Sequence, residues 1–223
     1  MATLSARSLD RSQVHIHADL VRLDGELAVP ESASGIVVFA HGSGSTRHSP
    51  RNKLVADTLN AAGLATLLFD LLTEKEAFSD AVDGHLRFDI PFLATRLEGA
   101  IDWLTTEPAT RALKSGVFGA STGAGAALVA AAERPDRVSA VVSRGGRPDL
   151  AGTWLRRVTA PTLLIVGSHD EEVVNLNRWA LARLPQNARL TLVPGATHLF
   201  EEPGTLEQAA ELARDWFLEW LKP

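Results

Sequence analysis

The chain has 223 residues, 45% hydrophobic and 22% charged, which is the composition of a protein that folds around a hydrophobic core. Its net charge of −5 gives no electrostatic reason to expect nucleic acid or an anionic membrane as a partner. Because the chain has no cysteine, disulfides, thiolate metal sites and cysteine nucleophiles are excluded. The N-terminus lacks the apolar segment of a signal peptide, and no stretch approaches the ~20 apolar residues of a membrane span, so we expect a cytoplasmic protein.

The first part of the chain has the pattern of extended structure. Residues 14–23 alternate loosely between apolar and polar side chains, and Asp24-Gly25 between two strand-like runs predicts a hairpin turn. His15 and His17 fall on one face of the predicted strand, at a spacing that metal hydrolases also use. Because no matching His and Asp ligands follow at later strand ends, we expect surface histidines and no metal site.

From residue 35 onward, short apolar runs alternate with longer helical patterns, which predicts a parallel sheet covered by helices. Most of the runs are continuously apolar, as expected for strands that are buried on both faces. The six runs span residues 35–42, 64–72, 115–121, 138–146, 161–170 and 188–198. There is no internal repeat, low-complexity tract or linker, so we predict a single α/β domain over residues 1–223, with six βα units after the hairpin.

The helices between these runs are marked by their ends and by apolar stripes. Ser49 and Pro50 predict a helix start, with Gly63 as its stop, and an apolar stripe predicts a second helix over 93–104. The last helix is predicted to open with a capping box at Thr205–Gln208 and to run to Trp220. The segment 72–90 has no clear periodicity, so we expect either a loop over the substrate site or a plain surface loop.

A serine motif lies where the third of these runs ends. Gly119-Ala120-Ser121-Thr122-Gly123 matches G-x-S-x-G between a predicted buried strand and a helix rich in glycine and alanine, which is the setting of a nucleophile elbow. The motif alone also fits a patch of small residues where a helix packs closely on a sheet. Whether Ser121 is a nucleophile therefore depends on whether the chain supplies a histidine and an acid to activate it.

Those partners stand at two later strand ends. A serine hydroxyl needs an imidazole to take its proton and an acid to orient that imidazole. The fifth run ends in Asp170 and the sixth in His198, which puts Ser121, Asp170 and His198 at one edge of the sheet in the order expected for this architecture. Glu171 or Glu172 could supply the acid instead, although acids there are also typical of a helix N-terminus.

Backbone amides near Ser121 would have to stabilise an oxyanion. We predict one donor at the Thr122 N–H and the other at the Ser43 N–H, with Gly42 as the alternative, because the "HGSGS" loop (41–45) follows the first central strand. His41 is expected to be a structural histidine within that loop.

A cluster of two arginines follows the 138–146 run. Arg144 or Arg147 could bind an anionic group of a substrate, and either could equally form a structural salt bridge. Arg144 after a glycine-rich turn would also suit a dinucleotide phosphate, but no clean G-x-G-x-x-G is present and the ribose-binding acid is missing. No P-loop pattern occurs.

With these motifs placed, the chain resembles the α/β-hydrolase superfamily and, within it, the dienelactone hydrolase family. The resemblance is carried by "VVFAHGSGSTRHSPRN", "HLRFDIP", "GVFGASTGAGAAL", "SRGGRPDLA", "LLIVGSHDEEV" and "LVPGATHLFEEPG". It implies a mostly parallel eight-stranded sheet with helices on both faces, little or no cap domain, the triad and oxyanion hole just named, and no cofactor. The name-giving members use a cysteine nucleophile, which this chain lacks, and this favours simple esters over dienelactone.

The sequence as a whole therefore predicts a carboxylesterase-type serine hydrolase of small esters that works through an acyl-enzyme. A thioesterase, lactonase or acyltransferase would use the same residues, and a non-catalytic ligand-binding protein of this fold is a further alternative. We expect a small-molecule ester as partner, no nucleic acid or membrane, substrate contacts at Gly42 and Arg144, and a monomer or homodimer.

Overall fold

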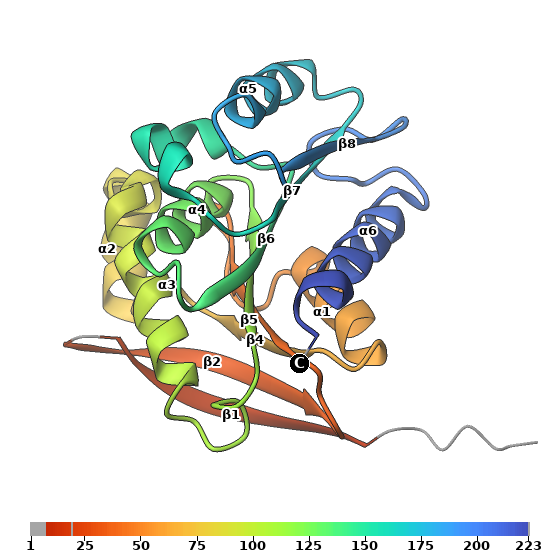
Figure 1. The fold of residues 1–223 in the computed structure, drawn as a ribbon. Coiled ribbons are helices and arrows are strands. Elements are labelled where there is room, and N and C mark those ends of the chain that lie inside the picture. Colours follow the sequence, from red (N-terminus) through yellow and green to blue (C-terminus); the bar gives the residue numbers. More distant parts are fainter. Residues whose placement is uncertain (1–7, 19, 223) are drawn as a thin grey trace, which may run out of the picture.

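One mixed sheet runs through the computed structural model, which describes residues 8–18 and 20–222 (Figure 1). Over these residues the sheet has eight strands: β1 (Leu9–Ala18), β2 (Val21–Pro30), β3 (Ile36–Ala40), β4 (Ala65–Phe69), β5 (Ser115–Ala120), β6 (Val138–Arg144), β7 (Thr162–Gly167) and β8 (Arg189–Val193). Their order across the sheet is β1-β2-β4-β3-β5-β6-β7-β8. Strands β3 to β8 are parallel, whereas β1 and β2 form an antiparallel hairpin at one edge. The predicted fold class is confirmed, and each of the six apolar runs contains one parallel strand.

The hairpin turn lies elsewhere than the sequence predicts. Asp24 and Gly25 are inside β2, and the chain reverses between Ala18 and Val21. Gly25 pairs with Phe69 of β4, and a Cβ on it would lie 3.2 Å from the Phe69 Cβ. The glycine therefore allows close packing within the sheet, and the prediction of a turn at this dipeptide is wrong.

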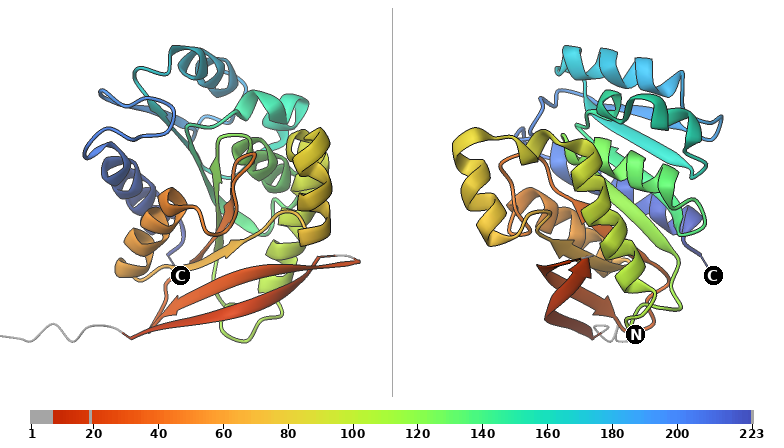
Figure 2. Two further views of the ribbon diagram at one scale, coloured as in Figure 1. Left: turned by 180° about the vertical axis from the view of Figure 1, so that it is seen from behind. Right: turned by 90° about the vertical axis from the view of Figure 1, so that its left-hand side faces the viewer.

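Helices cover both faces of the sheet (Figures 1 and 2). The α-helices are α1 (Pro50–Ala61), α2 (Glu74–Asp83), α3 (Ile90–Leu104), α4 (Gly123–Glu133), α5 (Glu171–Leu181) and α6 (Thr205–Trp220), and the 3₁₀ segments are η1 (Leu86–Phe88) and η2 (Pro148–Arg157). Helices α1 and α6 pack on one face, against Val37 and Phe39, while α3 and α4 pack on the other, against Val38. Successive residues of β3 thus enter opposite halves of the core, as strand geometry requires.

One of the predicted helix starts is confirmed and another is wrong. Ser49 caps α1 as expected, since its side chain accepts a hydrogen bond from the Asn52 N–H. In α6, however, Gly204 is the N-cap and no side chain caps the helix, so the predicted capping box is wrong. Thr205 is already the first helical residue, and its hydroxyl donates to the Glu202 carbonyl instead.

The segment 72–90 contains a helix where we expected a loop. Helix α2 begins with a reciprocal capping box, in which Thr73 accepts from the Glu76 N–H and Glu76 accepts from the Thr73 N–H. Phe78 and Val82 of α2 are exposed, so the helix does not bury its larger apolar side chains. The capping box was therefore the sequence signal for this helix.

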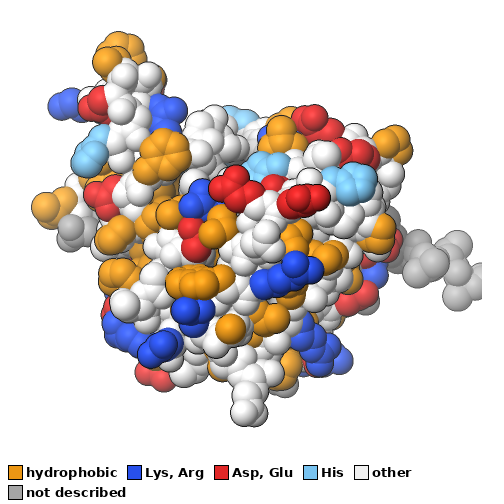
Figure 3. Space-filling model, turned by 90° about the horizontal axis from the view of Figure 1, so that it is seen from above, with side chains coloured by type: hydrophobic (Ala, Val, Ile, Leu, Met, Phe, Trp, Pro, Cys, Tyr) orange, Lys and Arg blue, Asp and Glu red, His pale blue; other side chains and the backbone are white. Residues whose placement is uncertain are grey.

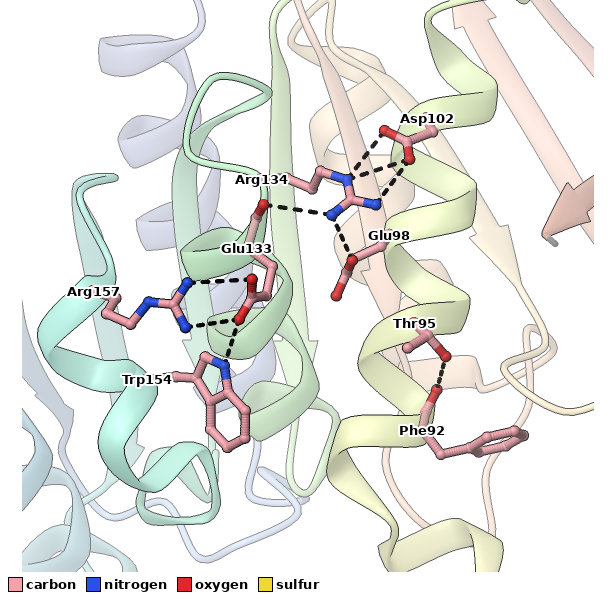
Figure 4. Close-up of polar contacts among 8 residues, drawn as sticks. All are labelled: Phe92, Thr95, Glu98, Asp102, Glu133, Arg134, Trp154 and Arg157. Carbon is pink, nitrogen blue, oxygen red and sulfur yellow. Dashed lines mark hydrogen bonds and ion pairs between the residues drawn. The ribbon is translucent and has the colours of Figure 1, made fainter.

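A polar network joins α4 to its neighbours (Figure 4). Arg134, which ends α4, pairs with Glu98 of α3 at 2.7 Å. Glu133 accepts a 2.7 Å hydrogen bond from the Trp154 indole N–H and pairs with Arg157 of η2 at 2.9 Å. The C-terminal end of α4 is thereby held from two sides, which restrains the helix that follows Ser121.

Charged and apolar side chains are mixed over the surface shown in Figure 3, where acidic, basic and hydrophobic groups lie interspersed. Within residues 8–18 and 20–222, no helix combines the length and the hydropathy that a membrane crossing would need.

We expect Phe217→Ala to lower the free energy of unfolding by about 3–5 kcal/mol, because Phe217 of α6 is fully buried and lies over Gly116 of β5. Phe78→Ala is the matched control, since Phe78 is 81% exposed and should change stability by less than about 0.5 kcal/mol. Urea denaturation followed by circular dichroism measures both. Equal losses in the two variants would contradict this assignment of the core.

Candidate active site

Ser121 occupies a strained turn between β5 and α4. Its φ of +50° lies in the left-handed region, which costs a non-glycine residue about 1–3 kcal/mol and persists only where surrounding contacts enforce it. Two contacts do so: the Ser121 N–H donates to the Arg144 carbonyl at 3.3 Å, and the Arg147 N–H donates to the Ser121 carbonyl at 3.0 Å. The turn is therefore fixed by the end of β6 and the residues that follow it.

Both glycines of the G-x-S-x-G motif are required by close backbone approach. A Cβ on Gly119 would lie 2.5 Å from the Ala124 Cα, and a Cβ on Gly123 would lie 2.6 Å from the His41 carbonyl oxygen. Neither distance is compatible with a side chain. The motif thus brings α4 and the loop after β3 directly against the turn that carries Ser121.

Ser121, His198 and Asp170 come together at the carboxyl edge of the sheet. The Ser121 Oγ lies 3.4 Å from the His198 Nε2, and the His198 Nδ1 lies 2.6 Å from the Asp170 Oδ2. The carboxylate favours a proton on Nδ1, which leaves Nε2 as an acceptor towards the serine. A long serine–histidine contact is common where no substrate is bound. The three residues that the sequence singled out are thus arranged for proton transfer.

The competing acids, Glu171 and Glu172, do not approach the histidine. Both are exposed in the first turn of α5, and no described hydrogen bond or ion pair joins either one to His198. Asp170 is the N-cap residue of α5, but its side chain does not cap the helix. The Asp170 carboxylate is therefore available to His198.

The two expected oxyanion donors lie side by side but are not equivalent. The Ser43 N–H donates to the Thr122 Oγ1 at 2.8 Å, a contact that the sequence did not indicate. Gly42 adjoins the nucleophile, because a Cβ there would lie 3.0 Å from the Ser121 Cβ. In this structure the Ser43 N–H is thus already hydrogen-bonded to the Thr122 hydroxyl.

His41 holds the loop that carries Ser43. Its Nδ1 lies 3.0 Å from the Gly42 carbonyl, and its Nε2 accepts the Leu71 N–H at 3.1 Å. Burial lowers the pKa of His41 below its usual value, so the ring is neutral at physiological pH. This is the structural role that the sequence suggested for His41.

Two cavities lie on either side of the loop that carries Ser43. One of about 240 Å³ opens beside Ser121 and His198 and is lined by Arg51 and Arg144. The other, of about 300 Å³, lies behind the Ser43 loop against α2 and is lined largely by apolar side chains such as Leu71.

The remaining residues of interest make ordinary surface contacts. Arg147 forms two hydrogen bonds of 2.8 Å with Asp149, which is the salt-bridge alternative for this residue. His15 is exposed and pairs with Asp24. Within the part of the chain that the structure describes, no group of three or more His, Cys, Asp or Glu side chains could hold a metal ion.

Comparison with known proteins agrees with this architecture. The sequence profile of the Dienelactone hydrolase family matches residues 23–223. The chain belongs to the dienelactone hydrolase family. A crystal structure of a dienelactone hydrolase from Anabaena variabilis is 57% identical, covers 96% of this chain and 99% of that one, and superposes with a TM-score of 0.95. The protein is thus a member of a hydrolase family with an α/β-hydrolase fold.

Other relatives are similar in different ways. Est1E from Butyrivibrio proteoclasticus, solved with ferulic acid, is 20% identical over 93% of this chain and 98% of that one, with a TM-score of 0.79, which shows the shared fold. A Mycobacterium tuberculosis protein named as a candidate phosphoribosyl transferase is 60% identical over 209 residues. That match covers 94% of this chain but 46% of the relative, so the chain spans about half of that protein's length.

We expect Gly123→Ala to lower both stability and activity, since the new methyl group would overlap the backbone of the His41 loop and displace it from Ser121. Gly125→Ala is the control in the same helix, where the nearest atom is the Leu150 Cβ at 3.0 Å and alanine favours the helix. Thermal unfolding and hydrolase activity measure the two effects. A Gly123→Ala protein as active and stable as Gly125→Ala would contradict the close approach described above.

The buried His41 should also make stability depend on pH. Because its folded pKa is lowered, protonation favours the unfolded chain, and stability is lost as pH falls through the unfolded value near 6.5. Between about pH 6.5 and 5.5 the wild type should therefore lose stability, and His41→Gln should lack this loss. Urea unfolding of both proteins at the two pH values measures the difference. Parallel losses in both proteins would contradict a neutral buried His41.

Proposed function

We propose that the protein is a serine hydrolase that cleaves small carboxylic esters through an acyl-enzyme. The observation that supports this most strongly is the continuous series of contacts from Asp170 through His198 to Ser121 on a strained strand-to-helix turn. A serine placed this way is the nucleophile that G-x-S-x-G turns present in hydrolases of this architecture. Membership of a hydrolase family agrees with the proposal.

In the proposed reaction the Ser121 Oγ attacks the ester carbonyl carbon while the His198 Nε2 takes its proton. Asp170 stabilises the imidazolium that forms. Collapse of the tetrahedral intermediate breaks the bond to the leaving alkoxide, which receives the proton from His198. Water then attacks the acyl-enzyme with His198 as the base again, and the carboxylic acid and free Ser121 are released.

Charge on the carbonyl oxygen would be held by backbone amides. The Thr122 N–H at the start of α4 is one proposed donor. The Ser43 N–H is the other, and it now donates to the Thr122 hydroxyl. We propose that the oxyanion replaces or shares this hydroxyl as the acceptor, so that the Ser43 amide stays hydrogen-bonded until substrate arrives and is not left unsatisfied.

The volumes of the two cavities indicate the size of the proposed substrate. The volume of about 240 Å³ beside Ser121 suits a small ester, and the apolar cavity behind the Ser43 loop suits a short acyl or alkyl chain. Thioesters, lactones and acyl transfer to an alcohol would use the same nucleophile, base and oxyanion donors. Among these substrates we propose carboxylic esters first, because their cleavage needs no binding group beyond the nucleophile, the base and the oxyanion donors.

The transferase named for the mycobacterial relative calls for a separate proposal. This chain matches 46% of that protein, and in this chain Ser121, Asp170 and His198 are in contact at one edge of the sheet. We propose that any phosphoribosyl transfer belongs to the rest of that relative's length.

The test is hydrolysis of 4-nitrophenyl acetate and butyrate by the wild type, Ser121→Ala and a control, Ser139→Ala, which alters β6 at the end remote from the site. We expect Ser121→Ala to lose at least about 10³-fold in kcat, because the nucleophile is gone, and Ser139→Ala to match the wild type. Circular dichroism verifies that all three proteins are folded. Equal rates in the wild type and Ser121→Ala would refute Ser121 as the nucleophile.

Labelling by a fluorophosphonate separates an enzyme from a non-catalytic binding protein of the same fold. The wild type should acquire one label on Ser121, and Ser121→Ala should acquire none. Absence of labelling in a folded wild type would refute the proposed activation of this serine.

A further inference from the structure

We propose that the side-chain hydroxyl of Thr122 is a third donor to the oxyanion, beside the backbone N–H groups of Thr122 and Ser43. The inference rests on the proposed esterase function and adds a catalytic residue to it. The hydroxyl keeps its proton throughout and forms one hydrogen bond to the negatively charged oxygen of each tetrahedral intermediate. The Ser43 N–H is then shared between the hydroxyl oxygen and the oxyanion.

The Thr122 hydroxyl is not used by the helix that Thr122 begins. Thr122 is the N-cap residue of α4, a position at which a threonine hydroxyl ordinarily accepts a hydrogen bond from an N–H of the first helical turn. That bond is absent, because Thr122 has helical backbone angles, with φ of −60° and ψ of −29°. The hydroxyl instead accepts the Ser43 N–H at 2.8 Å, from a loop 79 positions earlier in the chain.

The hydrogen of this hydroxyl is available to a ligand. A hydroxyl can donate one hydrogen bond besides those that it accepts. Over residues 8–18 and 20–222, the bond accepted from Ser43 is the one hydrogen bond of the Thr122 hydroxyl. Thr122 is 6% exposed, and a buried donor without an acceptor is unfavourable. An acceptor that arrives with the substrate removes this deficit.

The hydroxyl lies where negative charge develops in the proposed reaction. Thr122 directly follows the nucleophile, and its partner Ser43 lines the cavity together with Ser121 and His198. Gly42, next to Ser43, approaches the nucleophile so closely that a Cβ on it would lie 3.7 Å from the Ser121 Oγ. The oxygen of a carbonyl that Ser121 attacks therefore comes within reach of the two amides and of the hydroxyl that joins them.

Three features strengthen a hydrogen bond from this hydroxyl to an anion. The Ser43 N–H donates to the hydroxyl oxygen, which polarises the O–H bond and makes it a better donor. The N-terminus of α4, a helix of 11 residues, adds the positive end of its dipole at the same point. Burial reduces screening by water, so each of these interactions is stronger than it would be on the surface.

The test compares Thr122→Val, which keeps the shape of the side chain and removes the hydroxyl, with Thr122→Ser, which keeps the hydroxyl. Hydrolysis of 4-nitrophenyl butyrate is the measurement. We expect Thr122→Val to lose about 10- to 10²-fold in kcat with little change in KM, because the lost hydrogen bond forms only as the oxyanion forms. Thr122→Ser should retain most of the wild-type kcat.

Thr110→Val is the matched control for the loss of a buried threonine hydroxyl. Thr110 is 1% exposed, and its hydroxyl donates to the Leu104 carbonyl at 2.9 Å, in the segment before β5. This variant should unfold at a lower temperature and keep the wild-type kcat. If Thr122→Val behaves in the same way, Thr122 has a structural role and the proposal is refuted. A higher kcat in Thr122→Val would also refute it, because the hydroxyl would then obstruct the oxyanion.

A transition-state analogue tests the contact itself. Trifluoromethyl propyl ketone adds to a serine nucleophile and forms a hemiketal whose oxyanion lies among the oxyanion donors. Its inhibition constant should rise in Thr122→Val by the factor by which kcat/KM falls. A crystal structure of the wild-type adduct should place the hemiketal oxygen within about 3 Å of the Thr122 Oγ1. A separation above about 3.5 Å would refute the direct hydrogen bond.

The outcomes separate this inference from the proposed function. Cleavage that requires Ser121 but is unchanged in Thr122→Val would refute Thr122 as a donor and leave the esterase. Equal rates in the wild type and Ser121→Ala would refute the esterase, and the rate of fluorophosphonate labelling then tests Thr122, because the phosphoryl oxygen needs the same donors. Slower labelling of Ser121 in Thr122→Val would support the inference, and equal labelling or none would refute it.

Discussion

The turn that carries Ser121 depends on the close approach of three backbone segments. The end of β5, the start of α4 and the loop after β3 are in contact there, which is possible only because Gly119 and Gly123 have no side chains. The close approach brings Ser43 next to Thr122, and hydrogen bonds with Arg144 and Arg147 hold Ser121 in its left-handed conformation. A conformation that is unfavourable locally is maintained by packing that extends through the sheet and α4.

Charge at the carboxyl edge of the sheet is distributed unevenly, and the unevenness matches the proposed chemistry. Asp170 is bound to His198, and His41 is kept neutral by burial while it holds the Gly42 carbonyl. Arg144 alone among the site's buried cations lacks an acid within the described residues. A buried guanidinium without an acid lowers the stability of the folded chain.

The errors of prediction share a cause. Asp24-Gly25 has the form of a turn, yet Gly25 lies inside β2 because Phe69 of a distant strand needs the space above it. Thr205 is of a residue type that favours the N-cap position, yet the N-cap of α6 is Gly204, which has a φ of +80°. In both cases local propensity was overridden by contacts or conformations outside the local pattern. Helix α2 is the exception, since its capping box at Thr73 and Glu76 is a local signal that agrees with the helix that forms.

Local sequence was sufficient to predict the six parallel strands, because strands that are buried on both faces are continuously apolar. It was also sufficient to place Ser121, Asp170 and His198 together, because parallel strands end at one edge of the sheet. Local sequence did not predict the 2.6 Å contact between His198 and Asp170, which selects Asp170 over the two acids beside it. It also did not predict that the Thr122 hydroxyl accepts the hydrogen bond of the Ser43 N–H. Nor could it show that Arg144 is buried without an acid: Arg147 pairs with Asp149, two residues further along the chain, whereas the burial of Arg144 depends on tertiary packing. A buried strand can be predicted because its burial requires a run of apolar residues along the chain. The contacts of Asp170, Ser43 and Arg144 cannot, because they depend on distances between segments that only tertiary packing sets.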